Sequence, residues 1–140
     1  MKYIVNSLEE TKHVAEEFAK TLKEGDVVLL NGDLGAGKTT FTQFVFAFLG
    51  VNQVVNSPTF AILKSYEGKF NFHHFDTYRI STEEAIESGF DEVLNDKNSV
   101  IFIEWSENIA PLLPKNDIEI NIKRLNDSTR EIKIENKINS

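Results

Sequence analysis

Two uninterrupted apolar runs predict strands that are buried on both faces of a sheet. They are Val27–Leu30 and Val100–Ile103, and a polar residue follows each of them. Strands covered on both faces show this pattern, whereas strands with one solvated face alternate apolar and polar residues. We therefore expect both segments to lie at the parallel centre of a sheet.

Alternating positions predict antiparallel hairpins in addition to this centre. In the C-terminal part, isoleucines alternate with polar residues on both sides of a turn at Asn126 and Asp127, at positions Ile118, Ile120, Ile122, Ile132 and Ile134. Residues 60–66 and 69–76 are expected to form another hairpin. Tyr3–Asn6 is expected to form a short edge strand.

Apolar residues at helical spacing predict a helix over Leu8–Leu22, with Ser7 and Glu10 as a capping box at its start. A second helix is expected over Lys38–Leu49. A short third helix is expected after a cap at residue 81 or 82, with Gly89 interrupting it.

The segment GDLGAGKT, between the first apolar strand and the second helix, has the spacing of a phosphate-binding loop. Its defining residues are Gly32, Gly37, Lys38 and Thr39. In such a loop the backbone amides and the helix N-terminus surround phosphate oxygens. Lys38 is expected to reach the β- and γ-phosphates, facing ligand or solvent, and the Thr39 hydroxyl to bind Mg²⁺. The expected nucleotide-binding residues here are Gly35, Ala36, Gly37, Lys38, Thr39 and Thr40.

The elements together predict an α/β fold, a P-loop NTPase-like mixed sheet with a parallel centre, antiparallel hairpins and flanking helices. The chain has 140 residues, of which 41% are apolar, so it can bury a core. We expect residues 1–140 to form a single P-loop ATPase domain.

The composition of the chain limits the kinds of binding partner and cellular environment that are expected. The net charge of −7 argues against strong unaided binding of nucleic acid, which usually needs a basic face. The absence of cysteine excludes disulfides and thiolate metal sites and suits a cytoplasmic protein. The N-terminal segment lacks the apolar core of a secretory signal, and the run FVFAFLGV is too short to span a bilayer. We therefore expect no association with a membrane.

A triphosphate that carries Mg²⁺ is expected to need a carboxylate at the end of a strand beside the loop. Glu104 ends the second apolar run, whereas Asp76 ends the partly alternating segment FHHFD, which is more typical of a hairpin. We assign Glu104 to Mg²⁺, directly or through water, and Asp76 to orienting or activating the attacking water. A structural alternative for Asp76 is to cap the following turn. The residues alone leave open which carboxylate acts on the water.

Thr59 and Trp105 are candidates for a nucleotide switch or a partner contact. Thr59 lies in SPTF, where a hydroxyl after the loop helix can sense the γ-phosphate. The alternative is that Pro58 fixes a turn and Thr59 begins a strand. Trp105 either packs in the interior or contacts a partner. His73 and His74 should point to opposite faces of a strand, so a shared metal site is not expected.

Missing features favour ATP over GTP and hydrolysis over transfer to a small molecule. No Asn-Lys-x-Asp segment is present to read guanine, and no arginine-rich lid is present to close over a second substrate. The chain contains only Arg79, Arg124 and Arg130. Any arginine that stabilises a transferring phosphoryl group is therefore one of these or comes from a partner.

With these motifs in place, the sequence resembles the TsaE-type (YjeE-like) bacterial P-loop ATPases of tRNA threonylcarbamoyladenosine biosynthesis. The matching segments are GDLGAGKTTF, NSPTF, HFDTYRI, ESGFDEVL and IEWSE, together with the final hairpin containing TREIKI. They are spread over nearly the whole chain and are more specific than the phosphate loop alone.

The resemblance implies roles for individual residues. It implies that Thr39 binds Mg²⁺, that Asp76 is needed for activity, and that Glu104 and Trp105 are the Glu-Trp pair of the family. It also implies that Arg130 lies near the nucleotide and that Thr59 is the threonine of the family's Ser-Pro-Thr segment.

The resemblance further implies a partner-dependent Mg²⁺-ATPase. Family members hydrolyse ATP slowly alone and bind a threonylcarbamoyl transferase and its inactive paralogue, which hold the tRNA. That assembly modifies the adenosine beside the anticodon in tRNAs that read codons beginning with A. Two other functions remain open from the residues: a small-molecule kinase, and a nucleotide-gated binding module without useful hydrolysis.

Overall fold

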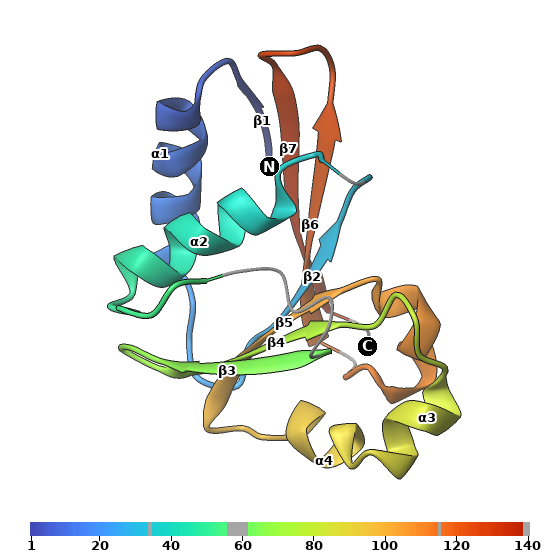
Figure 1. The fold of residues 1–140 in the computed structure, drawn as a ribbon. Helices are drawn as coiled ribbons and strands as arrows, with labels where there is room; N and C mark the ends of the chain where they lie inside the picture. The colour runs from blue at the N-terminus through green and yellow to red at the C-terminus, as the bar shows by residue number, and fades with distance from the viewer. Residues whose placement is uncertain (34, 56–61, 115, 139–140) are drawn as a thin grey trace.

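The computed structural model describes residues 1–33, 35–55, 62–114 and 116–138 (Figure 1). The strands are β1 (Lys2–Val5), β2 (Val27–Asn31), β3 (Leu63–Glu67), β4 (Asn71–Asp76), β5 (Ser99–Glu104), β6 (Asn116–Arg124) and β7 (Arg130–Ile138). The helices are α1 (Leu8–Ala19), α2 (Lys38–Phe48), α3 (Thr82–Glu87), α4 (Phe90–Leu94) and the 3₁₀ segment η1 (Ser106–Leu112).

The strands form one mixed sheet in the order β1-β7-β6-β2-β5-β4-β3. The four central strands, β6, β2, β5 and β4, pair in parallel. β3 and β7 are the antiparallel hairpin partners of β4 and β6, and β1 pairs antiparallel with β7. The predicted fold class is therefore confirmed, including the parallel pairing of the two uninterrupted apolar strands.

Two apolar clusters on opposite faces of the sheet explain the uninterrupted apolar runs. Val28 and Leu30 of β2 face the cluster formed with α1 and α2, whereas Val27 and Leu29 face the cluster that includes residues of α3, α4 and η1. Figure 1 shows these two groups of helices on opposite sides of the sheet. Successive strand residues thus enter different cores, as a two-sided central strand requires.

The helix ends follow the predicted caps with small differences. Ser7 Oγ accepts the Glu10 amide proton at 3.1 Å, but the Glu10 carboxylate reaches back to the amide of Asn6 rather than to that of Ser7. α1 ends at Ala19, three residues earlier than predicted, because the chain tightens there and the amide of Leu22 bonds the carbonyl of Ala19. Ser81 caps α3 with a complete capping box.

Candidate nucleotide-binding site

The loop between β2 and α2 requires glycine at two positions, and the physical reason differs between them. A Cβ atom on Gly32 would lie 2.5 Å from the carbonyl oxygen of Ile122, so no side chain fits there. Gly37, at the N-cap of α2, has φ of 110°, a conformation that side-chain-bearing residues rarely adopt. These constraints direct the loop across the end of β2 and place the N-terminus of α2 over the site, as phosphate binding requires.

The carboxyl ends of three parallel strands meet beside this loop. Leu30 of β2 is level with Glu104 of β5, and Glu104 is level with Asp76 of β4. Both carboxylates are largely enclosed, with Glu104 4% and Asp76 8% exposed. The prediction that the strand of Glu104 adjoins the loop strand is confirmed, and Asp76 lies one strand further away.

One cavity of about 520 Å³ brings most of the predicted residues together. Its lining consists of Gly35, Gly37, Lys38, Thr39, Thr40, Asp76, Tyr78, Arg79, Glu104 and Trp105. The hydroxyl of Thr39 and the two carboxylates are oxygen donors of the kind that Mg²⁺ prefers, with phosphate and water oxygens completing its shell. The described residues contain no cluster of three acidic, histidine or cysteine side chains that would hold a metal alone. The donor set therefore fits a metal that arrives with a phosphate ligand.

Lys38 is enclosed within the cavity that it lines. Its side chain is 6% exposed, and its Nζ lies 3.8 Å from Glu104 Oε1 and 4.5 Å from the centroid of the Trp105 ring. Of the two expected environments, ligand or solvent, the side chain faces the cavity, where these two neighbours hold the ammonium group. An ion pair and a cation–π contact both favour this placement.

The backbone at Trp105 turns sharply where β5 ends. Trp105 has φ of 62°, in the left-handed region, and its ring lies 4.8 Å from that of Tyr78. The Thr77 hydroxyl donates to the carbonyl oxygens of Glu104 at 3.0 Å and of Trp105 at 2.6 Å. These bonds hold the turn together and place the indole at the wall of the cavity, so Trp105 is not a core residue.

Sequence reasoning missed Tyr78 as a residue of the cavity wall, and it named Arg79 only as one of three arginines that could contact a phosphoryl group. The backbone amide of Tyr78 donates to Asp76 Oδ1 at 3.0 Å, so Asp76 also caps the turn that follows β4. The signal was available, because both residues lie within three positions of Asp76, where the strand ends.

The two histidines lie on opposite faces of β4, as predicted. His74 is fully buried, and its Nε2 lies 2.8 Å from Glu104 Oε2. His73 is half-buried on the other face, beside Ser65 and Asp96. The contact between His74 and Glu104 was not predicted.

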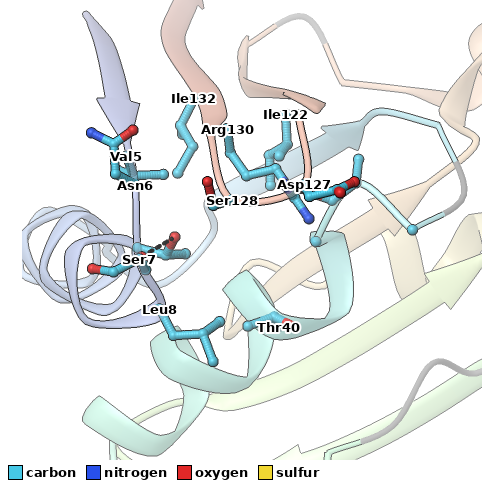
Figure 2. Close-up of a pocket in the computed structure, with 14 residues that line it drawn as sticks. Val5, Asn6, Ser7, Leu8, Thr40, Ile122, Asp127, Ser128, Arg130 and Ile132 are labelled. Carbon is cyan, nitrogen blue, oxygen red and sulfur yellow. Dashed lines mark hydrogen bonds between the residues drawn. The ribbon is translucent and has the colours of Figure 1, made fainter. Parts of the chain in front are cut away.

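Arg130 approaches the loop from the β6–β7 hairpin. Its Nε donates to the carbonyl oxygen of Ala36 at 3.1 Å, and it lines a second cavity of about 310 Å³. Figure 2 shows Arg130 and Ser128 on one side of this cavity, Ser7 and Leu8 from the start of α1 on another, and Thr40 of α2 below. Gly35, Gly37 and Thr40 line both cavities, so the loop separates them.

Two further predictions concern the switch role of Thr59 and membrane association. Thr59 lies outside the described residues, so its switch role stays a prediction. Within residues 1–33, 35–55, 62–114 and 116–138, no helix is long and apolar enough to cross a membrane.

The chain is similar to proteins of one family over most of its length. The family model described as "Threonylcarbamoyl adenosine biosynthesis protein TsaE" matches residues 5–132. A tRNA threonylcarbamoyladenosine biosynthesis protein TsaE from Rickettsia prowazekii is 50% identical over 131 residues, which cover 91% of this chain and 90% of the relative. The protein of the same name from Bacillus subtilis is 43% identical over 133 residues, which cover 94% and 83%. A crystal structure of Bacillus subtilis YdiB superposes with a TM-score of 0.78 and 36% identity, over 99% of this chain and 85% of that one.

Proposed function

Because the chain belongs to the TsaE family of threonylcarbamoyl adenosine biosynthesis proteins, we propose that it is a Mg²⁺-dependent ATPase subunit of tRNA threonylcarbamoyladenosine synthesis. One observation carries the catalytic part of the proposal. Lys38 and Thr39 from the start of α2 line the same cavity as the strand-end carboxylates Asp76 and Glu104. A P-loop lysine, a P-loop hydroxyl and a strand-end carboxylate are the parts that P-loop hydrolysis requires.

The two cavities on either side of the loop suggest how ATP would lie. The phosphates would occupy the cavity that contains Lys38, and the nucleoside would occupy the cavity beside Arg130, with Gly35–Thr40 between them. Phosphate oxygens would accept from the loop amides and from Lys38. The Arg130 side chain already donates to the carbonyl of Ala36, so it supports the loop from the nucleoside side.

Four residues of the cavity would have separate roles in ATP hydrolysis. Thr39 and Glu104 would hold Mg²⁺, which when bound neutralises developing phosphate charge. Asp76 would orient the attacking water, because its carboxylate lines the cavity and is fixed by the Tyr78 amide. Lys38 would exchange its contacts with Glu104 and Trp105 for contacts with phosphate oxygens.

The contacts of the three arginines are consistent with an ATPase activity that depends on a partner. Arg124 pairs with Asp127 at the tip of the hairpin, and Arg130 bonds the loop and hairpin carbonyls. Arg79 lines the phosphate cavity and is thus the candidate to contact phosphate in cis. We propose that the transferase and its inactive paralogue complete the site and hold the tRNA, since this chain has a net charge of −7.

The test is phosphate release from ATP by the purified chain, alone and with the transferase pair, for the wild type, Glu104→Ala and Asp76→Asn. We expect the transferase pair to stimulate phosphate release by the wild type. Both variants should stay folded but lose the stimulated release. Removing a group that orients or activates water costs on the order of 10²-fold or more. Bound ATP without stimulated release would contradict the proposal. Phosphate on an acceptor would then indicate a kinase, and nucleotide-dependent partner binding alone would indicate a binding module.

A further inference from the structure

His74 is a fully buried polar residue to which the proposed function gives no role. It is 0% exposed, and its Nε2 lies 2.8 Å from Oε2 of Glu104, which is itself 4% exposed. The ring packs edge-on against Phe46, with centroids 6.2 Å apart. A buried imidazole in this apolar cluster has a desolvation cost that a hydrocarbon side chain of similar size would not have. The contact with Glu104 compensates for that cost.

The surroundings of the ring determine where its proton lies. Within the described part of the chain, Nδ1 is buried and has no hydrogen-bond partner. A buried N–H group without an acceptor is rarer in proteins than an unfilled lone pair. The geometry therefore favours the tautomer with the proton on Nε2, which donates to the carboxylate of Glu104.

This hydrogen bond divides the two oxygens of Glu104 between two neighbours. Oε2 is held by His74, whereas Oε1 points to Lys38, whose Nζ is 3.8 Å away. His74 is level with Phe102 on β5, so the imidazole lies one pleat behind Glu104 on the same sheet face. The carboxylate is thus fixed from inside the protein, and its other oxygen remains available on the cavity side.

We propose that His74 is a positioning residue that sets the orientation of Glu104 for the metal–triphosphate complex. The inference rests on the proposed function for the role of Glu104, and on the observed contact for the role of His74. Carboxylate ligands of metals are commonly oriented by such outer hydrogen bonds, and losing one typically costs 10- to 100-fold in affinity or activity. His74 itself would touch neither the nucleotide nor the metal.

The test compares His74→Phe, which removes the donor, with His74→Gln, whose amide can donate from a similar position. His73→Phe is the matched control on the opposite face of β4. Thermal unfolding establishes that each variant folds. Calorimetry then measures ATP affinity with Mg²⁺ and with EDTA, and steady-state kinetics separate kcat from KM.

We expect His74→Phe to bind ATP in EDTA with the affinity of the wild type. The increase in ATP affinity that Mg²⁺ produces, and kcat, should each be lower than in the wild type by on the order of 10-fold or more. His74→Gln should recover most of both, and His73→Phe should change neither. A folded His74→Phe protein with wild-type Mg²⁺ dependence would overturn the inference alone. A wild type without any Mg²⁺-dependent ATP binding would overturn the proposed function itself.

A readout without nucleotide keeps the inference testable if His74→Phe does not fold. The chain has three histidines, so ¹⁵N imidazole spectra can be assigned by single substitutions. We expect a His74 signal protonated at Nε2 in the metal-free protein, and a clear shift of that signal in Glu104→Ala. Protonation at Nδ1 alone, or a signal unchanged by Glu104→Ala, would overturn the inference.

Discussion

The Lys38 ammonium group lies over the ring of Trp105, 4.5 Å from its centroid. Because Glu104 Oε1 is only 3.8 Å from the same nitrogen, the lysine of the phosphate loop is held by the two residues that end β5 and begin the following turn. A triphosphate would compete with both contacts for this single cation. Binding of a nucleotide in this cavity would therefore change the environment of Trp105.

The first prediction concerns Trp105 fluorescence. Trp105 is the only tryptophan in the chain, so intrinsic emission at long wavelength reports on it alone. We expect ATP with Mg²⁺ to change this emission in a saturable way, because Lys38 leaves the ring. Titration of the wild type measures the effect, and Trp105→Phe should give no signal. Unchanged emission at ATP saturation, verified by calorimetry, would contradict the coupling.

The second prediction separates the charge of Lys38 from its packing. Lys38→Met keeps most of the buried stem but removes the cation, so ATP affinity should fall by about 1.5–3 kcal/mol, the value of a charge-assisted hydrogen bond. Stability should change less than in Lys38→Ala, which also leaves unfilled space beside Trp105. Equilibrium unfolding in urea and calorimetry measure the two effects. Equal ATP affinity in Lys38→Met and the wild type would exclude a phosphate contact for Lys38.

The sheet centre was predictable from the sequence, but the place of β6 in it was not. The runs in β2 and β5 are uninterrupted because their alternate residues enter two different cores. β6 alternates because Ile120 and Ile122 enter only the core beneath α1 and α2. Alternation is typical of antiparallel strands, so the pattern of β6 predicted its hairpin with β7 but not its parallel pairing with β2.

Most residues of the candidate site were predictable from the sequence, but the contacts between them were not. The loop and both strand-end carboxylates follow from motifs and strand ends. The hydrogen bond of His74 to Glu104 depends on the strand order and on the register of β4 against β5, which are long-range properties. The position of Lys38 depends on the left-handed backbone of Trp105, a conformation that no propensity would assign to tryptophan.

The third prediction uses two glycines with nearly the same positive φ. Gly35 in the phosphate loop and Gly89 between α3 and α4 have φ of 79° and 78°, and a Cβ atom on either would meet nothing within 4 Å. Alanine at either position should therefore cost about 1–2 kcal/mol through backbone strain alone. Only Gly35→Ala should also weaken ATP binding, because only Gly35 lines the two cavities. Calorimetry and urea unfolding of both variants measure this difference, and equal loss of ATP affinity in both would refute it.

The fourth prediction concerns the pH dependence of stability through Asp96, far from the nucleotide site. The hydroxyl of Ser99 donates to Asp96 Oδ2 at 2.7 Å, the amide of Asn98 donates to Oδ1 at 2.9 Å, and His73 Nε2 lies 3.4 Å from Oδ2. These groups lower the pKa of Asp96 below its ordinary value, with the Ser99 hydroxyl as the largest cause.

A carboxyl group whose folded-state pKa is lowered stabilises the fold above its unfolded pKa, and this contribution disappears as the pH falls through the folded pKa. Asp96→Asn should therefore destabilise the protein at neutral pH, and the difference from the wild type should shrink in acid. In Ser99→Ala, the stability contribution of ionised Asp96 should disappear at a higher pH than in the wild type. This variant removes the hydroxyl that contributes most to lowering the pKa of Asp96. Urea unfolding from neutral to acidic pH measures these effects. A difference between the wild type and Asp96→Asn that stays constant over this range would show that the Asp96 charge does not contribute to stability.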